Sequence, residues 1–437
     1  MSGLAPIEIT AADGAVATAL AQVLQAAGTT ANIVDQPSGT ARTVILTEGL
    51  QSGDLIERHW SALAQACLAQ SGAAKIVCLQ HTATNYAEQI GLAGLARTLR
   101  KEWEAVETVC WAFEACEPDL IVRALSGGLS DALIASYGSW RAQAIGPAML
   151  PPSVQSAGHA GVWLVTGGAR GVTATCTIEL ARRTGGTFIL AGRSAQAAWP
   201  DGVAKTTDIK VLRAALAQRA KATGEKIKLP DLDRMARQAL AGQEIGETIA
   251  AIAAAGGAAH YAQLDLSDDA AVRVQVVDMQ ARFGQITGLV HGAGVLADRL
   301  ALKKTRSDLE TVFGPKVLGL QSVLAALDVS ALSHVALFSS ASAAFGNIGQ
   351  ADYAMANTCL NQIASLLASQ VPDLRAKAFN WGPWDGGMVD ANLAELFAAQ
   401  GIGLIDRQDG ARIFADQLLD GDPAEVELLV GDRWTVS

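Results

Sequence analysis

The chain has 437 residues, half of them apolar and only 5% aromatic, and it carries a net charge of −10. This length is sufficient for two domains, and the acidic charge argues against a general role in binding nucleic acids or anionic membranes. The six cysteines form no C-x-x-C pair and no metal-ligand spacing, and no apolar run reaches transmembrane length. We therefore expect no metal site, buried thiols and a reducing, cytoplasmic location. No signal peptide opens the chain, and from its abrupt Met-Ser-Gly start we expect a segment of a longer polypeptide.

Strand and helix signals alternate through the first 150 residues. Strands are expected at 7–10, 31–34, 44–47, 76–79 and 109–113, and helices at 14–27, 55–70 and 88–104. This alternation predicts a parallel sheet with crossover helices. The turn after the first strand, residues 11–14, lacks the G-x-G-x-x-G pattern, so we predict that residues 1–150 form a Rossmann-like layer without a cofactor site. The alternative is an independent α/β domain with its own ligand, but no polar cluster marks a site there.

Residues 144–160 form a connector rich in Pro, Ser and Gly. A strand at 140–144 is expected to link the two halves. The second domain, residues 151–437, opens with a buried strand at 161–166, a Gly-rich turn and a helix at 175–183. Strand, glycine turn and helix in this order form a phosphate cradle, because glycines admit the pyrophosphate and helix N–H groups stabilise its charge. The candidate cradle residues are Thr166, Gly167, Gly168, Ala169, Arg170, Gly171 and Val172.

The next strand, 187–190, ends at Arg193 and Ser194, where NAD-specific proteins tend to carry an acid. Arg193 and Arg170 are expected to clamp the 2′-phosphate of NADPH, since guanidinium groups bind phosphate in a bidentate manner. The alternative is that both arginines are solvated surface residues.

An insertion of roughly 40 residues beyond ordinary connection lengths follows at 200–245. Helices are expected at 205–223, 232–240 and 244–255, with an interruption at 226–230. A solvated helical excursion is the favoured interpretation, and a docking surface is the alternative.

A helix at 307–327, broken at Gly314-Pro315, carries Lys316 on its apolar stripe. A strand at 335–338 then runs into Ser340, a loop spans 343–350, and a helix spans 353–370. Tyr353 and Asn357 share one face of that helix. A phenol and a hydroxyl can exchange a proton with a carbonyl oxygen, and a nearby cation would lower the phenol pKa from its ordinary value of about 10.

The arrangement of Ser340, Tyr353 and Asn357 resembles the active site of short-chain dehydrogenase/reductases. It is more narrowly similar to the ketoreductase domains of type I polyketide and fatty acid synthases, in which Asn replaces the usual Lys and the Lys lies in a Pro-Lys-Val context, here 315–317. The insertion and the stretch 167–174 resemble most the ketoreductases of polyunsaturated fatty acid synthases. The ketoreductases of enediyne-type iterative synthases are the next most similar. The family's T-G-x-x-x-G-x-G turn matches except for Thr173, which replaces the last Gly.

The resemblance implies an α/β fold of two Rossmann-like subdomains, the first structural and the second catalytic. In the first, the helix containing 94–100 would pack on the catalytic half. In the second, the resemblance implies cofactor contacts from residues after strands at 259–264, 288–291 and 377–381. These are Asp265 and Leu266 at the adenine, Gly292, Ala293 and Gly294 at the nicotinamide ribose, and Pro383 within a W-G-x-W stretch. A helix at 390–400 would be a lid or a surface helix, and 426–430 the last strand.

The resemblance also implies a reaction, the NADPH-dependent reduction of a 3-keto group on an acyl thioester. Tyr353 would protonate the oxygen, Ser340 would hydrogen-bond it, Lys316 would lower the Tyr353 pKa, and Asn357 would anchor Lys316 or a water. Ala297-Asp298 in place of the family's Asp-Asp, together with Phe345 rather than Trp, favours the D (3R) alcohol.

The substrate would arrive on the phosphopantetheine arm of an acyl carrier protein within a multidomain synthase. Its acidic surface would need a basic patch, for which residues 303–306 are one candidate; these residues also fit a solvated turn. Two other functions remain open: a catalytically silent megasynthase domain, favoured only by Thr173, and a free-standing carbonyl reductase.

Overall fold

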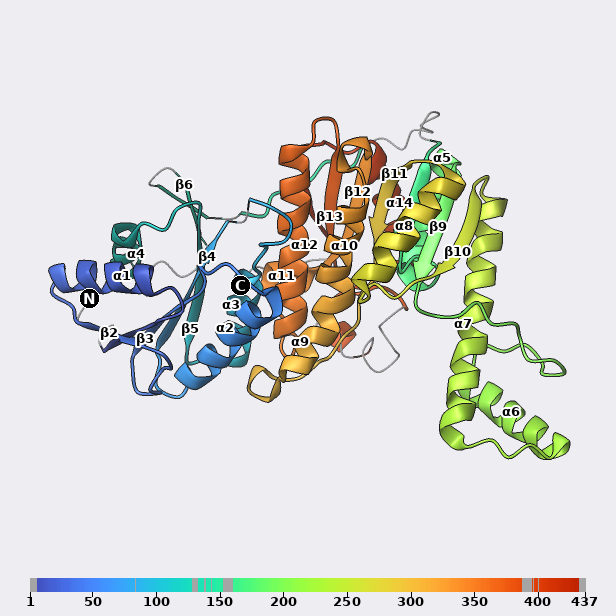
Figure 1. Cartoon of the computed structure of the whole chain (residues 1–437), viewed down its shortest axis with the longest axis horizontal. Coiled ribbons are helices and arrows are strands. Elements are labelled where there is room, and N and C mark those ends of the chain that lie inside the picture. The colour runs from blue at the N-terminus through green and yellow to red at the C-terminus, as the bar shows by residue number, and fades with distance from the viewer. Residues whose placement is uncertain are drawn as a thin grey trace.

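The computed structural model describes residues 6–82, 84–127, 133–136, 139–142, 144–151, 160–386, 395, 397–399 and 401–431. These residues form an α/β protein with two sheets of seven strands each, and helices α9, α11 and α12 lie between the sheets (Figure 1). The predicted fold class is thereby confirmed. Among the described residues, no helix combines the length and apolar content needed to cross a bilayer. Most of the expected helix at 390–400 lies outside the described residues.

The first sheet has the order β2-β1-β3-β4-β5-β6-β7 and is parallel except for the β6–β7 hairpin. Its strands are β1 (Ile7–Thr10), β2 (Ala31–Val34), β3 (Thr43–Gly49), β4 (Lys75–His81), β5 (Glu107–Phe113), β6 (Leu133–Ser136) and β7 (Ser139–Ala142). Its helices are α1 (Gly14–Ala26), α2 (Leu55–Ala69), α3 (Leu92–Glu102) and α4 (Pro118–Ser126). The five predicted strands are confirmed. The strand expected at 140–144 exists as β7, but it pairs within this sheet and does not link the halves.

A buried polar cluster lies at the carboxyl edge of this sheet, where the sequence indicated none. The Thr10 hydroxyl donates to Glu48 Oε2 over 3.1 Å, while the Thr47 N–H donates to Thr10 Oγ1 over 2.9 Å. Glu48 is 1% exposed, and burial raises the pKa of its carboxyl group to about 7. The cluster comes from the ends of β1 and β3, which are neighbours in the sheet.

The pKa of Glu48 predicts a pH-dependent cost to folding. Because the folded-state pKa is raised, the folded protein binds more protons than the unfolded chain between pH 4.5 and 7, so stability falls as the pH rises through that window. A shift of this size corresponds to about 3 kcal/mol. We expect Glu48→Gln to raise the free energy of unfolding at pH 8 by up to that amount and to change little at pH 5, as measured by urea denaturation. An equal effect at both pH values would contradict this assignment.

The second sheet is fully parallel, with the order β10-β9-β8-β11-β12-β13-β14. Its strands are β8 (Val162–Thr166), β9 (Thr187–Gly192), β10 (Ala258–Gln263), β11 (Ile286–His291), β12 (His334–Ser340), β13 (Arg375–Trp381) and β14 (Glu427–Val430). The connecting helices are α5 (Gly171–Thr184), α6 (Ile209–Thr223), α7 (Leu229–Ala254), α8 (Asp269–Phe283), α9 (Arg306–Phe313), α10 (Gly319–Ala326), α11 (Ala341–Phe345), α12 (Ala351–Gln370) and α14 (Arg407–Leu419). From β8 the chain adds β9 and β10 on one side, and it then crosses back to place β11 on the other side of β8. The residues that follow β8 and β11 therefore line one crevice at this switch point.

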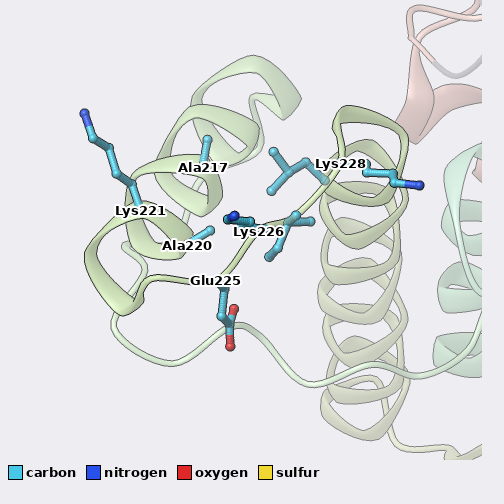
Figure 2. Close-up of a pocket in the computed structure, with 8 residues that line it drawn as sticks. Ala217, Ala220, Lys221, Glu225, Lys226 and Lys228 are labelled. Carbon is cyan, nitrogen blue, oxygen red and sulfur yellow. The ribbon is translucent and has the colours of Figure 1, made fainter.

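The insertion is a helical hairpin that projects from the second sheet (Figure 1). The expected helices at 232–240 and 244–255 are one continuous helix, α7, because Pro230 occupies its first turn and no residue breaks it afterwards. Leu212, Leu216 and Leu232 form a small core between α6 and α7. Near that core is an open hollow with Lys226 in its middle and the side chains of Lys221 and Lys228 pointing outward (Figure 2).

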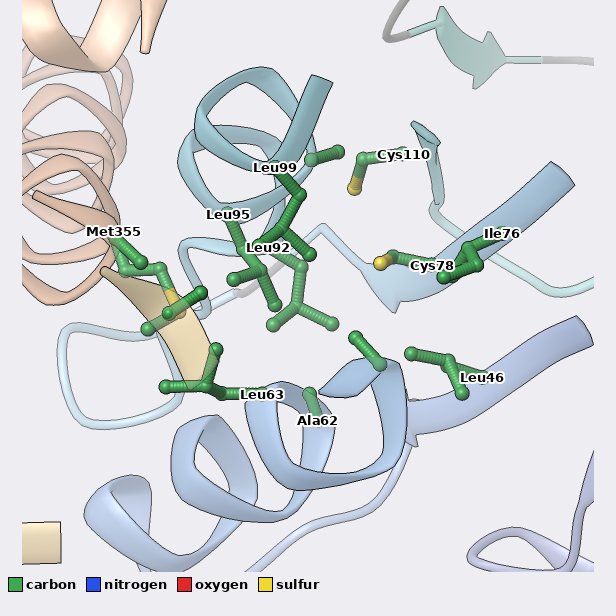
Figure 3. Close-up of a cluster of buried hydrophobic side chains, with 14 of the residues drawn as sticks. Leu46, Ala62, Leu63, Ile76, Cys78, Leu92, Leu95, Leu99, Cys110 and Met355 are labelled. Atoms are coloured by element: carbon green, nitrogen blue, oxygen red, sulfur yellow. The ribbon is translucent and has the colours of Figure 1, made fainter. Parts of the chain in front are cut away.

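Helix α3 of the first half packs directly on α12 of the second, as the sequence predicted for residues 94–100. One hydrophobic core continues across the contact, from Leu46 and Cys78 through Leu95 to Met355 (Figure 3). The two helices approach closely because α3 presents Gly94 to the α12 backbone: a Cβ atom there would overlap the Ala354 carbonyl. The first half of the chain therefore supports the helix that carries Tyr353.

We expect Gly94→Ala to destabilise the protein although Ala is the better helix former. The added methyl would lie 2.7 Å from Thr358 Oγ1 and overlap the neighbouring backbone, a strain of about 1–3 kcal/mol against a propensity gain of about 1 kcal/mol. Gly246→Ala in α7 is the matched control, because nothing lies within 4 Å of its added Cβ. Thermal unfolding should show a lower melting temperature for Gly94→Ala and a higher one for Gly246→Ala; a stabilised Gly94→Ala would contradict the packing.

Candidate active site

Lys316 lies in a π-helical segment, Gly314–Leu318, between α9 and α10. Pro315 has no N–H to donate, which disfavours regular α-helical bonding at this point, and π-turns within helices often occur at functional sites. The predicted break in the helix at 314–315 is thus confirmed. Lys316 is 3% exposed, and its Nζ donates to the Phe338 carbonyl over 2.9 Å.

The Lys316 Nζ lies 5.1 Å from the centroid of the Tyr353 ring, so the two residues meet as the sequence predicted. The expected direction of the pKa shift is wrong. Burial raises the pKa of the Tyr353 phenol and outweighs a lowering by the Asn357 side chain. Burial also lowers the pKa of the Lys316 ammonium to about 7. The desolvation of both groups therefore favours a protonated phenol beside an amine that titrates near neutrality.

Ser340 ends β12, and its Oγ accepts from the Ser342 N–H over 3.2 Å, which caps α11. Asn357 donates from Nδ2 to the Tyr353 carbonyl over 2.8 Å, rather than anchoring Lys316. Its Oδ1 is buried and has no hydrogen-bond partner among the described residues. A buried acceptor of this kind is costly unless a donor reaches it, so Asn357 Oδ1 fits the proposed role of holding a water.

His291 is a site residue that the sequence did not reveal. Its Nε2 contacts the Lys316 carbonyl at 2.9 Å and its Nδ1 contacts Thr166 Oγ1 at 2.8 Å. Burial and the Lys316 charge lower the pKa of this imidazole to about 3, so it is neutral. Because a carbonyl only accepts, Nε2 carries the proton and Thr166 donates to Nδ1. His291 thereby joins the ends of β8 and β11 to the segment that holds Lys316.

The two glycine turns have the shape that a dinucleotide requires. Gly167 adopts φ +71°, and a Cβ there would lie 2.8 Å from the Ala293 nitrogen. Gly171 adopts φ +63° with open space around it, at the first position of α5, and the Arg170 cap makes no side-chain bond to the helix. A Cβ on Gly294 would lie 3.3 Å from Lys316 Nζ. A pyrophosphate at the start of α5 and a ribose near Lys316 fit these positions.

Several predicted cofactor residues have other partners in the structure. Thr166 bonds His291, and Leu266 is buried in the core that α8 and α10 form against the second sheet. Thr173 is buried against Gly292, where it fills the space a Cβ on that glycine would need, rather than offering a hydroxyl outward.

The carbonyl of Ala169 accepts from Thr248 of α7 over 2.9 Å. Gly168 is packed on Val165. These residues hold the shape of the turn through contacts within the protein.

The arginine clamp is only partly present. Arg170 forms an ion pair with Glu244 of α7, a partner 74 residues away that no local pattern indicates. Arg193 is exposed, and its charge contributes to lowering the pKa of Asp265, after the two hydrogen bonds from Ser267. Asp268 caps α8. The carbonyl of Ser194 accepts from the Tyr261 hydroxyl over 2.5 Å.

Pro383, Asp298 and the residues 303–306 each have defined contacts in the structure. Pro383 follows β13, and its carbonyl accepts from the Ile405 N–H over 2.8 Å. Asp298 accepts from Gln350 Nε2 over 3.0 Å, which brings the 295–300 loop onto the residues before Tyr353. Two residues of the suggested basic patch at 303–306 do not offer a free positive charge. The Lys304 side chain is buried against Asp352, and Arg306 pairs with Glu57 and Glu310.

Comparison with known proteins agrees with this geometry. Residues 161–386 match the family model described as KR domain. One of the subunits of the polyunsaturated fatty acid synthase of Thraustochytrium sp. is 39% identical over 279 residues, which are 62% of this chain and 10% of that protein. Polyketide synthase PksL of Bacillus subtilis is 31% identical over 244 residues, 54% of this chain and 4% of that protein. The chain thus spans about a tenth or less of these relatives.

Solved structures give the same fold over nearly the whole chain. A ketoreductase domain from the bacillaene assembly line has a TM-score of 0.67 and 22% identity, covering 97% of this chain and 91% of that one. An N-terminal ketoreductase from the macrolactin assembly line has a TM-score of 0.69 and 20% identity, covering 98% and 87%.

Proposed function

The chain belongs to the KR domain family, the ketoreductase domains of polyketide and polyunsaturated fatty acid synthases, and on that premise we propose that it reduces the 3-keto group of an acyl thioester with NADPH. The observation that carries the proposal is the meeting of Lys316 Nζ and the Tyr353 ring at 5.1 Å. The position of Gly294 next to Lys316 Nζ and the open space around Gly171 support it further.

The residues of the site have complementary tasks in this reaction. When bound, the reduced nicotinamide supplies hydride to the ketone carbon. Tyr353 donates its phenolic proton to the oxygen as negative charge develops there, and the Ser340 hydroxyl donates a hydrogen bond to the same oxygen. Lys316, with a pKa near 7, can return a proton to the phenolate. Asn357 Oδ1 accepts from a water that connects this relay to solvent.

The preference for NADPH depends on Arg193 in this proposal. Arg170 is already paired with Glu244, whereas Arg193 is exposed at the end of β9. We expect Arg193→Ala to raise KM for NADPH about tenfold or more, since a charge-assisted phosphate contact contributes about 1.5–3 kcal/mol, and to change KM for NADH little. Steady-state kinetics with both cofactors measures this, and equal changes would remove Arg193 from the clamp.

The substrate carrier and the product configuration are further parts of the proposal. The relatives are large multidomain synthases, which supports delivery of the thioester by the phosphopantetheine arm of an acyl carrier domain. Ala297, Asp298 and Phe345 support the 3R alcohol. Chiral analysis of the product formed from a 3-ketoacyl thioester tests this part.

The proposed activity is tested by NADPH oxidation with a 3-ketoacyl N-acetylcysteamine thioester and with trans-1-decalone. We expect both ketones to be reduced by the purified chain. A catalytically silent domain would reduce neither, although it would keep the fold. A small-alcohol carbonyl reductase would favour short ketones over the thioester.

A further inference from the structure

We propose that the buried Lys304–Asp352 ion pair is a positioning device that holds the 295–300 loop against Tyr353 and so sets the rate and the facial selectivity of ketone reduction. The inference rests on the proposed function and concerns residues outside the reacting groups. Asp352 directly precedes Tyr353 in α12, and Lys304 follows the loop that contains Ala297 and Asp298.

The pair connects the loop and the catalytic residue through three short contacts. Lys304 Nζ lies 2.7 Å from Asp352 Oδ1 and donates to the Ala297 carbonyl over 2.6 Å. The same Asp352 Oδ1 accepts the Tyr353 N–H over 2.8 Å. A displacement of either charged side chain therefore moves both the loop backbone and the start of the helix that aims the phenol.

Other contacts hold the same loop near its carboxyl end. The Arg299 N–H donates to the Gly349 carbonyl over 2.9 Å. Glu102, at the end of α3, accepts from the N–H groups of Ala301 and Gly349 at 2.8 and 2.9 Å. The Lys304–Asp352 pair differs from these contacts because both of its charged side chains are buried, and it contacts the loop at Ala297.

Stability alone does not account for such a pair. Both side chains are 0% exposed, and a buried ion pair is often no more stabilising than apolar residues of similar volume. Asp352 Oδ2 is also buried without a hydrogen-bond partner among the described residues, which adds a cost. What the pair provides that apolar residues cannot is direction: its two charges fix one orientation of the loop relative to the phenol.

The test replaces the pair by apolar residues, Lys304→Met/Asp352→Leu, and measures a 3-ketoacyl thioester reaction. We expect kcat to fall about tenfold or more, because small displacements of reacting groups slow catalysis strongly, and the ratio of 3R to 3S alcohol to change at least about fivefold. KM for NADPH should stay within about twofold. The control Arg183→Met/Asp416→Leu removes another largely buried pair, between α5 and α14, together with the second ion pair of Arg183, to Asp420. It should keep the wild-type alcohol ratio.

A folded double variant with the wild-type kcat and alcohol ratio would overturn the inference. If the double variant does not fold, Asp352→Asn serves in its place, since its amide oxygen can still accept from Lys304 and Tyr353. Loss of the carboxylate charge should change the ratio of 3R to 3S alcohol by about twofold or more, and an unchanged ratio would overturn the inference as well. Failure of the wild-type chain to reduce any 3-ketoacyl thioester would instead contradict the proposed function.

Discussion

Tyr353→Phe is expected to lower kcat for ketone reduction by about 10²–10⁴-fold, the usual contribution of a positioned general acid. The variant removes one oxygen atom and leaves the ring that lies 5.1 Å from Lys316 Nζ. In the wild-type protein burial raises the phenol pKa, so the proton needed by the developing alkoxide is present at neutral pH. No other phenol among the described residues lies on the same face of α12.

The fold and the cofactor affinity should survive this change. The α12 backbone and the Asn357 contact to the residue 353 carbonyl do not depend on the hydroxyl. NADPH binding, measured by the change in nicotinamide fluorescence, should stay within about twofold of the wild-type value. Near-normal reduction of 3-ketoacyl thioesters by a folded Tyr353→Phe variant would defeat the assignment of the acid.

Lys316→Met is expected to have two opposite effects, a loss of activity of at least about 10²-fold and a gain in stability. The amine is 3% exposed, and burial lowers its pKa from 10.5 to about 7. The unfolded chain therefore binds more protons than the folded chain between pH 7 and 10.5. The free-energy cost of burying the Lys316 ammonium is therefore largest below pH 7 and disappears as the pH rises to 10.5.

Removal of the amine should stabilise the protein by up to about 3 kcal/mol at pH 8. The loss of the hydrogen bond from the amine to the Phe338 carbonyl reduces this gain. This gain should shrink towards pH 10. Denaturant titrations at the two pH values measure it. Lys377→Met is the matched control, because Lys377 is also a buried lysine, with a pKa lowered by burial to about 8, but it lies near the start of β13 and bonds two carbonyls of 422–425. The control should keep its activity.

A Lys316→Met variant that is destabilised at pH 8 would show that the ammonium is held by partners strong enough to offset its burial. Retained turnover would remove Lys316 from the relay. The combination expected here, more stable and inactive, is the pattern of a residue kept for chemistry at a cost to folding.

The second half of the chain was largely predictable from the sequence because its signals are local. The alternation of strands and helices needs only short-range patterning, and the turn at 167–171 shows its glycines directly. Gly314-Pro315 predicted the interruption of the helix, since proline has no N–H, whereas Lys316 was expected from the Pro-Lys-Val context of the resembling family. The four-residue spacing of Tyr353 and Asn357 placed both on one helix face.

The features that the sequence did not reveal depend on residues far apart in the chain. Glu244 pairs with Arg170 across 74 residues, and Lys304 pairs with Asp352 across 48. In the sequence Lys304 belongs to a basic tetrapeptide that looks solvated. His291 ends an apolar strand and carries no motif, so its contacts with Thr166 and Lys316 emerge only when β8 and β11 lie side by side. The direction of the Tyr353 pKa shift could not be predicted because a sequence does not show how deeply a side chain is buried.

The central claim is that this site reduces a ketone at the carbon facing a reduced nicotinamide. The most direct measurement is a single-turnover reaction of the chain with a 3-ketoacyl thioester and NADPH deuterated at C4 of the nicotinamide, followed by mass spectrometry and chiral separation. We predict one deuterium at C3 of the acyl chain and an excess of the 3R alcohol. An unchanged keto thioester, or an alcohol without deuterium at C3 when either face of the nicotinamide is labelled, would contradict the account.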